Sequence, residues 1–225
     1  MKAVAIAGAG FLLAGVSFAE DRQDALQARL RNVEEPRILF VGNSYSFKLP
    51  GALAREVKRK VIVEGVTKGG WTLQKHAASK ETLARIRGGE WDVVVLQEQS
   101  QLPAFNKEQR NRKMIPPAQA LVAEIRKMGA VPVFFQTWGR RDGDHKNAEA
   151  FPKDTFEKMQ HRLVIGYREA AAAAEGALVV PVGEAWAREM KEGTGKRLFG
   201  KDGSHPSAAG VNFSAGVFKN FFFGE

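Results

Sequence analysis

The chain contains no cysteine and, after its first residues, no long hydrophobic run. Without cysteine it has no disulfide framework, no catalytic thiol and no Cys-ligated zinc site. A chain of 225 residues buries roughly 70% of its unfolded surface in one core, so it does not depend on such links for stability. A charged fraction of 26% together with 15 Phe and 4 Trp is typical of a folded protein and argues against disorder.

The first 19 residues have the pattern of a secretory signal peptide. A basic start at Met1-Lys2 precedes a run of small and apolar residues at 3–16. Ser17 and Ala19 then place small residues at the positions that a signal peptidase recognises. We expect cleavage after Ala19 and a secreted or periplasmic protein. The alternative is a membrane anchor, but an apolar stretch of about 17 residues is at the short limit for spanning. Residues 20–35 are charged, with Leu and Ala at helical spacing, and are expected to form a linker or a short helix.

The chain has more basic than acidic residues, 34 Lys and Arg against 25 Asp and Glu. The basic residues are scattered in short groups, and no expected helix carries them with the interleaved aromatic residues of nucleic-acid grooves. We therefore expect no nucleic-acid partner. A solvated basic surface is the simplest interpretation, and steering of acidic substrates or anionic surfaces is the alternative.

Five short apolar segments alternate with segments of helical spacing. The expected strands are 37–42, 61–66, 91–96, 131–135 and 177–182, and the expected helices are 49–60, 73–87, 116–128, 151–174, 184–192 and 208–222. Strands that are apolar on both faces are typical of a parallel sheet covered by helices on both sides. The sequence thus predicts a three-layer α/β/α domain at 36–225 around a five-stranded parallel sheet. Its ligand site should lie beyond the carboxyl ends of the strands.

Polar residues suited to nucleophilic catalysis stand at two such places. Ser44 follows the first strand, where its hydroxyl would be exposed and a helix N-terminus can stabilise nearby negative charge, although Gly-Asn-Ser is also an ordinary turn. Asp202 and His205 lie three apart in the loop before the last helix. Such a loop can present an imidazole to a serine and a carboxylate to the other ring nitrogen, as in a Ser-His-Asp triad.

Four segments in order resemble the conserved blocks of the SGNH (GDSL-type) hydrolase superfamily, and its carbohydrate-esterase-like branch in particular. They are 42–45, 69–72, 96–100 and 202–206. The resemblance implies a flavodoxin-like SGNH hydrolase fold, in which Ser44 is the nucleophile, His205 the general base and Asp202 the residue that orients His205.

The resemblance also implies an oxyanion hole. Its donors would be the backbone N–H groups of Ser44 and Gly70 and a side-chain amide from the third block. Where the family has an Asn, this chain offers Gln99, with Gln97 as the alternative. A Gln carries the same amide on one more methylene group.

Other residues near the expected site have two interpretations each. Trp138, Arg140 and Arg141 follow the fourth strand, where Trp138 would stack on a sugar ring and the arginines would bind a carboxylate or hydroxyls. They are equally typical of a core tryptophan and a solvated loop, and Trp71 beside Gly70 is ambiguous in the same way.

The remaining histidines give no sign of a metal site. His76, His145 and His161 show no metal-ligand spacing, so we expect no metal and no cofactor.

These patterns together predict a secreted serine esterase that hydrolyses small acyl esters, with O-acetyl groups on carbohydrate as the favoured substrates. An acyltransferase with the same triad and a catalytically weak polysaccharide-binding relative are the alternatives. No stable membrane insertion is expected after removal of the signal peptide.

Overall fold

The fold is built on a five-stranded parallel sheet, seen in a computed structural model that describes residues 9–225, with side chains from residue 20 onward. The strands are β1 (Arg37–Gly42), β2 (Ile62–Thr67), β3 (Val93–Leu96), β4 (Val131–Phe135) and β5 (Leu178–Val180). Their order is β2-β1-β3-β4-β5. This is the flavodoxin-like order, which places a topological switch point between β1 and β3. The predicted fold class is therefore confirmed.

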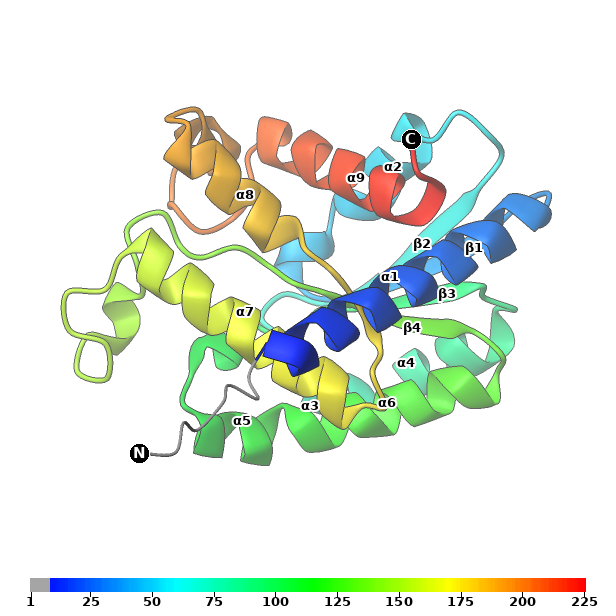
Figure 1. Ribbon diagram of the computed structural model, residues 1–225, viewed down its shortest axis with the longest axis horizontal. Coiled ribbons are helices and arrows are strands. Elements are labelled where there is room, and N and C mark those ends of the chain that lie inside the picture. The colour runs from blue at the N-terminus through cyan, green and yellow to red at the C-terminus, as the bar shows by residue number, and fades with distance from the viewer. Residues whose placement is uncertain (1–8) are drawn as a thin grey trace, which may run out of the picture.

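Helices cover both faces of the sheet (Figure 1). One face carries α1 (Ala9–Asn32), α2 (Leu49–Glu56), α8 (Val182–Lys191) and α9 (Ala208–Phe223), and the other carries α3 (Leu73–Ala77), α4 (Lys80–Gly88), α6 (Ile115–Lys127) and α7 (Phe156–Ala173). A short helix, α5 (Lys107–Lys113), precedes α6. Alternate residues of β1 enter the two cores, Ile38 and Phe40 on one side and Leu39 and Val41 on the other. Because both faces of the sheet are covered, the buried residues of the central strands β1, β3 and β4 are almost all apolar, whereas the edge strand β2 also contains Glu64 and Thr67.

Capping side chains account for most differences between predicted and observed helices. The helix expected at 73–87 is broken in two because Ser79 accepts the Thr82 N–H and starts α4. Thr155 accepts the Lys158 N–H in the same way, so α7 begins later than expected. The unpredicted α5 starts at a capping box formed by Asn106 and Gln109.

Helix α1 runs through the expected cleavage point after Ala19, while residues 1–8 of the expected signal peptide lie outside the described residues. Leu26 and Leu30 of α1 are buried in the core, and Gln27 donates a hydrogen bond to the Phe221 carbonyl of α9. Residues 20–32 are thus packed against the domain. No helix between residues 9 and 225 combines the length and apolar composition needed to cross a bilayer.

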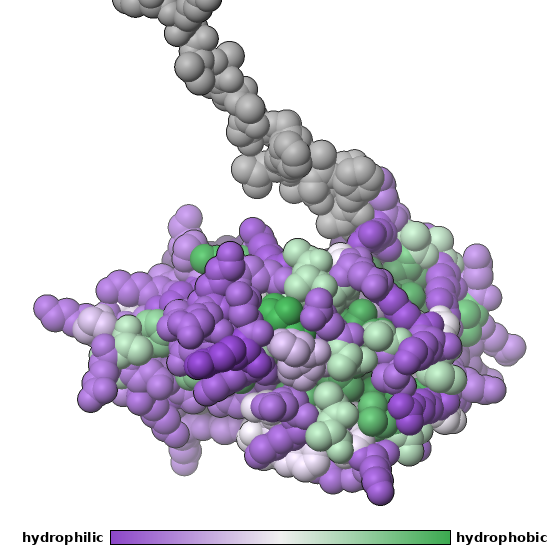
Figure 2. Space-filling model, turned by 90° about the horizontal axis from the view of Figure 1, so that it is seen from below, coloured by the Kyte–Doolittle hydropathy of each residue, from purple (hydrophilic) through white to green (hydrophobic). Residues whose placement is uncertain are grey.

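The surface of the domain is mostly hydrophilic. Figure 2, which views the molecule from below, shows charged and polar side chains over most of that face, with apolar residues lying between them. Among the side chains described, the exposed large hydrophobic ones are Phe47, Met128 and Ile165. This face is therefore a solvated polar surface.

Candidate active site

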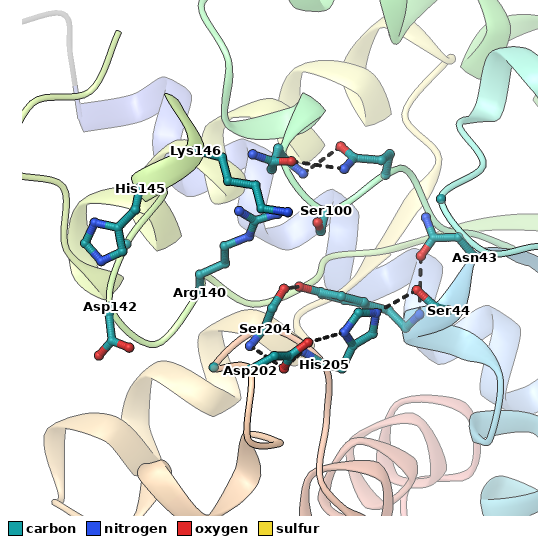
Figure 3. Close-up of a pocket in the computed structure, with 16 residues that line it drawn as sticks. Asn43, Ser44, Ser100, Arg140, Asp142, His145, Lys146, Asp202, Ser204 and His205 are labelled. Carbon is teal, nitrogen blue, oxygen red and sulfur yellow. Dashed lines mark hydrogen bonds and ion pairs between the residues drawn. The ribbon is translucent and has the colours of Figure 1, made fainter. Parts of the chain in front are cut away.

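A cavity of about 470 Å³ lies at the carboxyl ends of the strands (Figure 3). Its walls come from segments that follow β1, β2, β3 and β4 and from the loop before α9. The lining residues are 43–45, Gly70, 99–101, Arg140, 142–143, 145–146 and 202–205. The cavity is therefore where the winding of the sheet predicts a ligand site.

Ser44, His205 and Asp202 form one chain of hydrogen bonds at the wall of this cavity (Figure 3). Ser44 Oγ lies 2.9 Å from His205 Nε2, and His205 Nδ1 lies 2.5 Å from Asp202 Oδ2. Asp202 Oδ1 also accepts the backbone N–H groups of Ser204 and His205, each at 3.0 Å. The structure thus brings together three residues that are up to 161 positions apart in the sequence.

The electrostatics of Asp202 favour one tautomer of His205. Burial of part of the carboxyl group opposes its ionisation, but hydrogen bonds from the His205 ring and from two backbone N–H groups outweigh this, and the pKa of Asp202 is about 2. At neutral pH the ionised Asp202 accepts a proton bound to His205 Nδ1. The lone pair of Nε2 then faces the Ser44 hydroxyl, as a general base requires.

Gln97 holds the turn that carries Ser44. Its Oε1 accepts the Asn43 N–H at 2.9 Å and the Ser46 hydroxyl at 3.0 Å, and the side chain is fully buried. A Cβ on Gly42 would come within 2.6 Å of this oxygen, which explains the glycine. The interpretation of Gln97 as an alternative oxyanion donor is wrong, because its amide lies behind the turn and outside the cavity.

Glu98, which sequence reasoning missed, links the two loops expected to form the oxyanion hole. It is fully buried, and its Oε1 accepts the Leu73 N–H at 3.1 Å and the Gln99 N–H at 2.6 Å. Its Oε2 has no hydrogen-bond partner among the described residues. Burial raises its pKa to about 8, so the group is largely protonated at neutral pH. An acidic residue two positions after the apolar strand β3 was the signal available in the sequence.

Gly70 and Gln99 line the cavity as predicted. Gly70 has φ +70°, a backbone conformation that glycine adopts without strain, and no atom lies within 4 Å of where a Cβ would stand. Gln99 Nε2 donates to Gln101 Oε1 at 3.3 Å, and Gln99 Oε1 accepts the Gln101 N–H at 2.9 Å. The Gln99 amide therefore has a protein partner in this structure.

Trp138 is a core residue, so the expectation that it stacks on a sugar ring is wrong. Only 1% of its surface is exposed. Its indole is stacked between Tyr45, at 4.9 Å, and Trp186, at 3.9 Å, so both faces are covered. Trp138 Nε1 donates to the Ser204 carbonyl at 3.0 Å, which attaches the loop carrying His205 to the core.

The other predicted substrate-binding residues differ in position. Arg140 lines the cavity. Arg141 does not, and its guanidinium pairs with Asp142 through two hydrogen bonds of 3.0 and 2.8 Å. Trp71 also lies outside the cavity lining, with Lys68 Nζ 4.9 Å above its ring. Of these four residues, the structure brings only Arg140 to the cavity.

His76 is a buried structural residue. Its Nε2 lies 2.8 Å from the Gly42 carbonyl oxygen and its Nδ1 lies 3.0 Å from Thr82 Oγ1. Burial lowers its pKa. Across residues 9–225, no group of three His, Asp or Glu side chains converges as metal ligands.

The fold is similar to those of several solved structures. A protein assigned as an SGNH hydrolase from Slackia heliotrinireducens is 29% identical, with a TM-score of 0.68 over 83% of this chain and 98% of that one. A DUF4886 family protein from Bacteroides uniformis is 17% identical, with a TM-score of 0.67 over 85% of this chain and 84% of that one. The acetylxylan esterase Axe2 from Geobacillus stearothermophilus is 17% identical, with a TM-score of 0.57 over 83% of this chain and 94% of that one. No protein-family model and no curated protein matches the chain.

Proposed function

We propose that this chain is a member of the SGNH hydrolase superfamily and a serine esterase that removes small acyl groups, O-acetyl above all, from carbohydrate. The observation that carries the proposal is the hydrogen-bonded line from Ser44 Oγ through His205 to Asp202 at the wall of an open cavity. A nucleophile, a base and a residue that orients the base stand there in the order that acyl transfer requires.

In the proposed reaction, Ser44 Oγ attacks the ester carbonyl while His205 Nε2 takes the hydroxyl proton. The tetrahedral intermediate collapses when His205 returns that proton to the leaving alkoxide, which leaves an acyl-serine. Water, deprotonated by His205, then attacks the acyl-serine and releases the acid, and Ser44 regains its proton. Asp202 stays ionised throughout, because its pKa lies far below neutral pH.

The oxyanion of the intermediate needs donors on the side away from His205. The backbone N–H groups of Ser44 and Gly70 supply two of them in our proposal. Gln99 supplies the third by exchanging its 3.3 Å contact with Gln101 for the substrate oxygen. Hydrogen bonds of this kind commonly form only when the reacting complex assembles.

Two observations support a small polar substrate. The cavity is lined largely by polar side chains and glycines and holds only a small molecule or the end of a chain. One similar structure is an acetylxylan esterase, which makes acetylated carbohydrate the substrate class to test first.

We further propose that the protein is exported and that residues 1–19 are removed. The sequence pattern of these residues supports this. Leu26 and Leu30, which α1 buries in the core, both follow the proposed cleavage point, so cleavage leaves these contacts intact.

Acetate release from acetylated xylooligosaccharides tests the proposal. Wild-type protein should release acetate and react with a fluorophosphonate probe, while Ser44→Ala should lose both. Ser100→Ala, which removes another serine that lines the cavity, is the matched control and should retain both. Absence of probe labelling in folded wild-type protein would overturn the esterase proposal. Labelling without acetate release, but with transfer to an added alcohol, would instead indicate an acyltransferase.

A further inference from the structure

The cavity wall that faces Ser44 carries basic side chains from the loop after β4. Arg140, His145 and Lys146 lie on this wall, across the cavity from Ser44 and His205 (Figure 3). When the acyl carbonyl of a substrate lies at Ser44, the rest of the substrate extends toward this wall.

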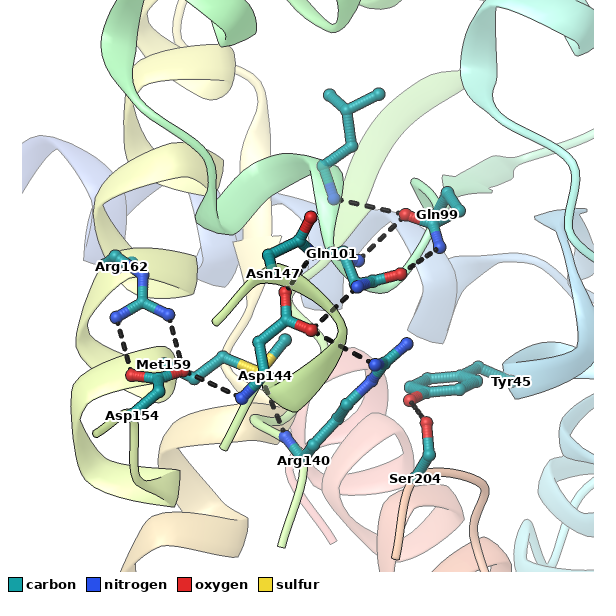
Figure 4. Close-up of polar contacts among 11 residues, drawn as sticks. Tyr45, Gln99, Gln101, Arg140, Asp144, Asn147, Asp154, Met159, Arg162 and Ser204 are labelled. Atoms are coloured by element: carbon teal, nitrogen blue, oxygen red, sulfur yellow. Dashed lines mark hydrogen bonds and ion pairs between the residues drawn. The ribbon is translucent and has the colours of Figure 1, made fainter. Parts of the chain in front are cut away.

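Arg140 is held in place by a buried carboxylate. Its Nη1 donates to Asp144 Oδ1 at 3.2 Å, and Asp144 has no exposed surface. The Asp144 carboxylate also accepts from Gln101 Nε2 at 2.8 Å and from Asn147 Nδ2 at 2.7 Å (Figure 4). Asp144 thus orients the guanidinium through Nη1 and leaves Nη2 available, because the Asp144 oxygens also accept from the two amides.

A second ion pair anchors this arrangement to α7. The Asp144 backbone N–H donates to Asp154 Oδ2 at 2.8 Å, and Asp154 accepts two hydrogen bonds from Arg162 of 2.9 and 2.7 Å (Figure 4). These contacts hold the Asp154 pKa below its ordinary value despite the opposing effect of burial. The loop that carries Arg140 is therefore ordered before any ligand binds, which lowers the entropy cost of binding.

Arg140 retains donors for a ligand. Among the described residues, no hydrogen-bond partner is found for Nη2, and Figure 4 shows this nitrogen on the side away from Asp144. A planar guanidinium with free N–H groups matches the geometry of a carboxylate.

The acidic residues of this wall are already paired with arginines. Asp142 pairs with Arg141, which holds the pKa of Asp142 low, and Asp144 pairs with Arg140. Lys146, in contrast, has no ion pair with any residue from 9 to 225. The positive charge on this wall thus exceeds what its own carboxylates compensate, even though Asp144 offsets much of the Arg140 charge.

We propose that Arg140 and Lys146 form a subsite for a carboxylate, so that the preferred substrate is an acylated acidic sugar rather than an acylated neutral one. This inference rests on the proposed esterase function. The carboxylate lies against Arg140 and Lys146 while the acyl carbonyl lies at Ser44.

A matched pair of esters tests the subsite: mono-O-acetylated methyl glucuronoside and mono-O-acetylated methyl glucoside, each used as a mixture of positional isomers. Wild-type protein should show a kcat/KM at least about tenfold higher for the glucuronoside, the scale of one charge-assisted hydrogen bond. Raising the ionic strength should reduce this preference, because salt screens the attraction of exposed Lys146.

Arg140→Gln should bring the ratio of the two kcat/KM values close to one. Arg141→Gln is the matched control, since Arg141 lies outside the cavity lining, and it should keep the wild-type ratio. If Arg140→Gln fails to fold, Lys146→Gln at an exposed position serves instead and should lower the ratio severalfold.

Equal kcat/KM values for the two esters in wild-type protein, or a ratio unchanged in both Arg140→Gln and Lys146→Gln, would overturn the subsite. If that result comes with hydrolysis of 4-nitrophenyl acetate, the esterase proposal stands and only the subsite fails. If wild-type protein hydrolyses none of the three esters, the esterase proposal fails, and the subsite fails with it.

Discussion

Ser44 stands between two sets of side chains that differ in their exposure to solvent. On one side, His205 and Asp202 have side chains that are 49% and 51% exposed. On the other side, Gln97 and Glu98 have no exposed surface. Of the exposed pair, His205 contacts the Ser44 hydroxyl and Asp202 contacts His205, whereas the buried pair contacts the backbone of the turns around Ser44.

This difference separates chemistry from positioning. An exposed imidazole can exchange protons with substrate and water, and replacing it or the exposed carboxylate should leave the core undisturbed. The buried Gln97 and Glu98 accept hydrogen bonds from buried backbone N–H groups that would otherwise lack partners. Leaving one such donor unpaired costs roughly 1–3 kcal/mol. Substitutions on the two sides should therefore change different measurements.

The largest effect is expected on the exposed side, for Asp202→Asn. The Asn carbonyl oxygen can still accept the two backbone N–H groups, but its NH₂ group faces His205 Nδ1 and favours the wrong tautomer. We expect kcat/KM for 4-nitrophenyl acetate to fall about 10⁴-fold, with a change in unfolding free energy within about 1 kcal/mol. A loss of activity below tenfold would contradict the role of Asp202.

A smaller effect on activity is expected for Gln99→Leu, whereas Gln97→Met should change stability instead. Loss of one oxyanion donor should lower kcat by about 10²–10³. Gln97→Met leaves the Asn43 N–H and the Ser46 hydroxyl unpaired and should cost about 2–4 kcal/mol of unfolding free energy. Steady-state kinetics and urea denaturation of both variants check this. An unchanged kcat in Gln99→Leu would contradict the role of Gln99 and show that backbone N–H groups alone stabilise the oxyanion.

The smallest effect on activity is expected for Glu98→Gln, which tests the buried side through pH. The folded-state pKa of Glu98 is about 8, above its ordinary value of 4.5, so the folded protein holds this proton more tightly than the unfolded chain. This contribution to stability is full below pH 4.5 and is lost as pH rises through about 8, at about 1.4 kcal/mol per unit of pKa difference. Glu98→Gln keeps the acceptor oxygen and cannot ionise.

Urea denaturation of wild-type protein and Glu98→Gln between pH 5 and 9 measures this contribution. The stability of the variant relative to wild type should rise with pH across this range. Parallel pH curves for the two proteins would show that Glu98 is ionised in the folded state.

The sequence predicted the sheet and the meeting of Ser44, Asp202 and His205 at one edge of it, because both predictions follow from local patterns at the strand ends. Apolar runs separated by helical spacing predict parallel strands, and a Ser after the first strand with Asp-x-x-His before the last helix predicts residues at one edge of the sheet. The structure places Ser44, Asp202 and His205 within hydrogen-bond reach of one another at that edge.

The sequence did not predict which polar residues face inward. Gln97 and Gln99 are the same residue type two positions apart, and only the pairing of β3 with β1 decides that Gln97 lies under Asn43. Trp138 belongs to the core because Trp186, 48 positions later, covers one of its faces. Asp144 and Asp154 follow no periodic pattern, so their burial depends entirely on tertiary contacts with Arg140 and Arg162.

The stacking of Trp138 on Trp186 makes the tryptophan spectra of the protein sensitive to the conformation of a loop at the cavity. Two indoles 3.9 Å apart and tilted by 4° share their electronic excitation, so their absorption and emission depend on the geometry of the pair. Because Trp138 also donates to the Ser204 carbonyl, a displacement of the loop that carries His205 changes this geometry. The intrinsic fluorescence and circular dichroism of the unlabelled protein should therefore change when the loop that carries His205 moves.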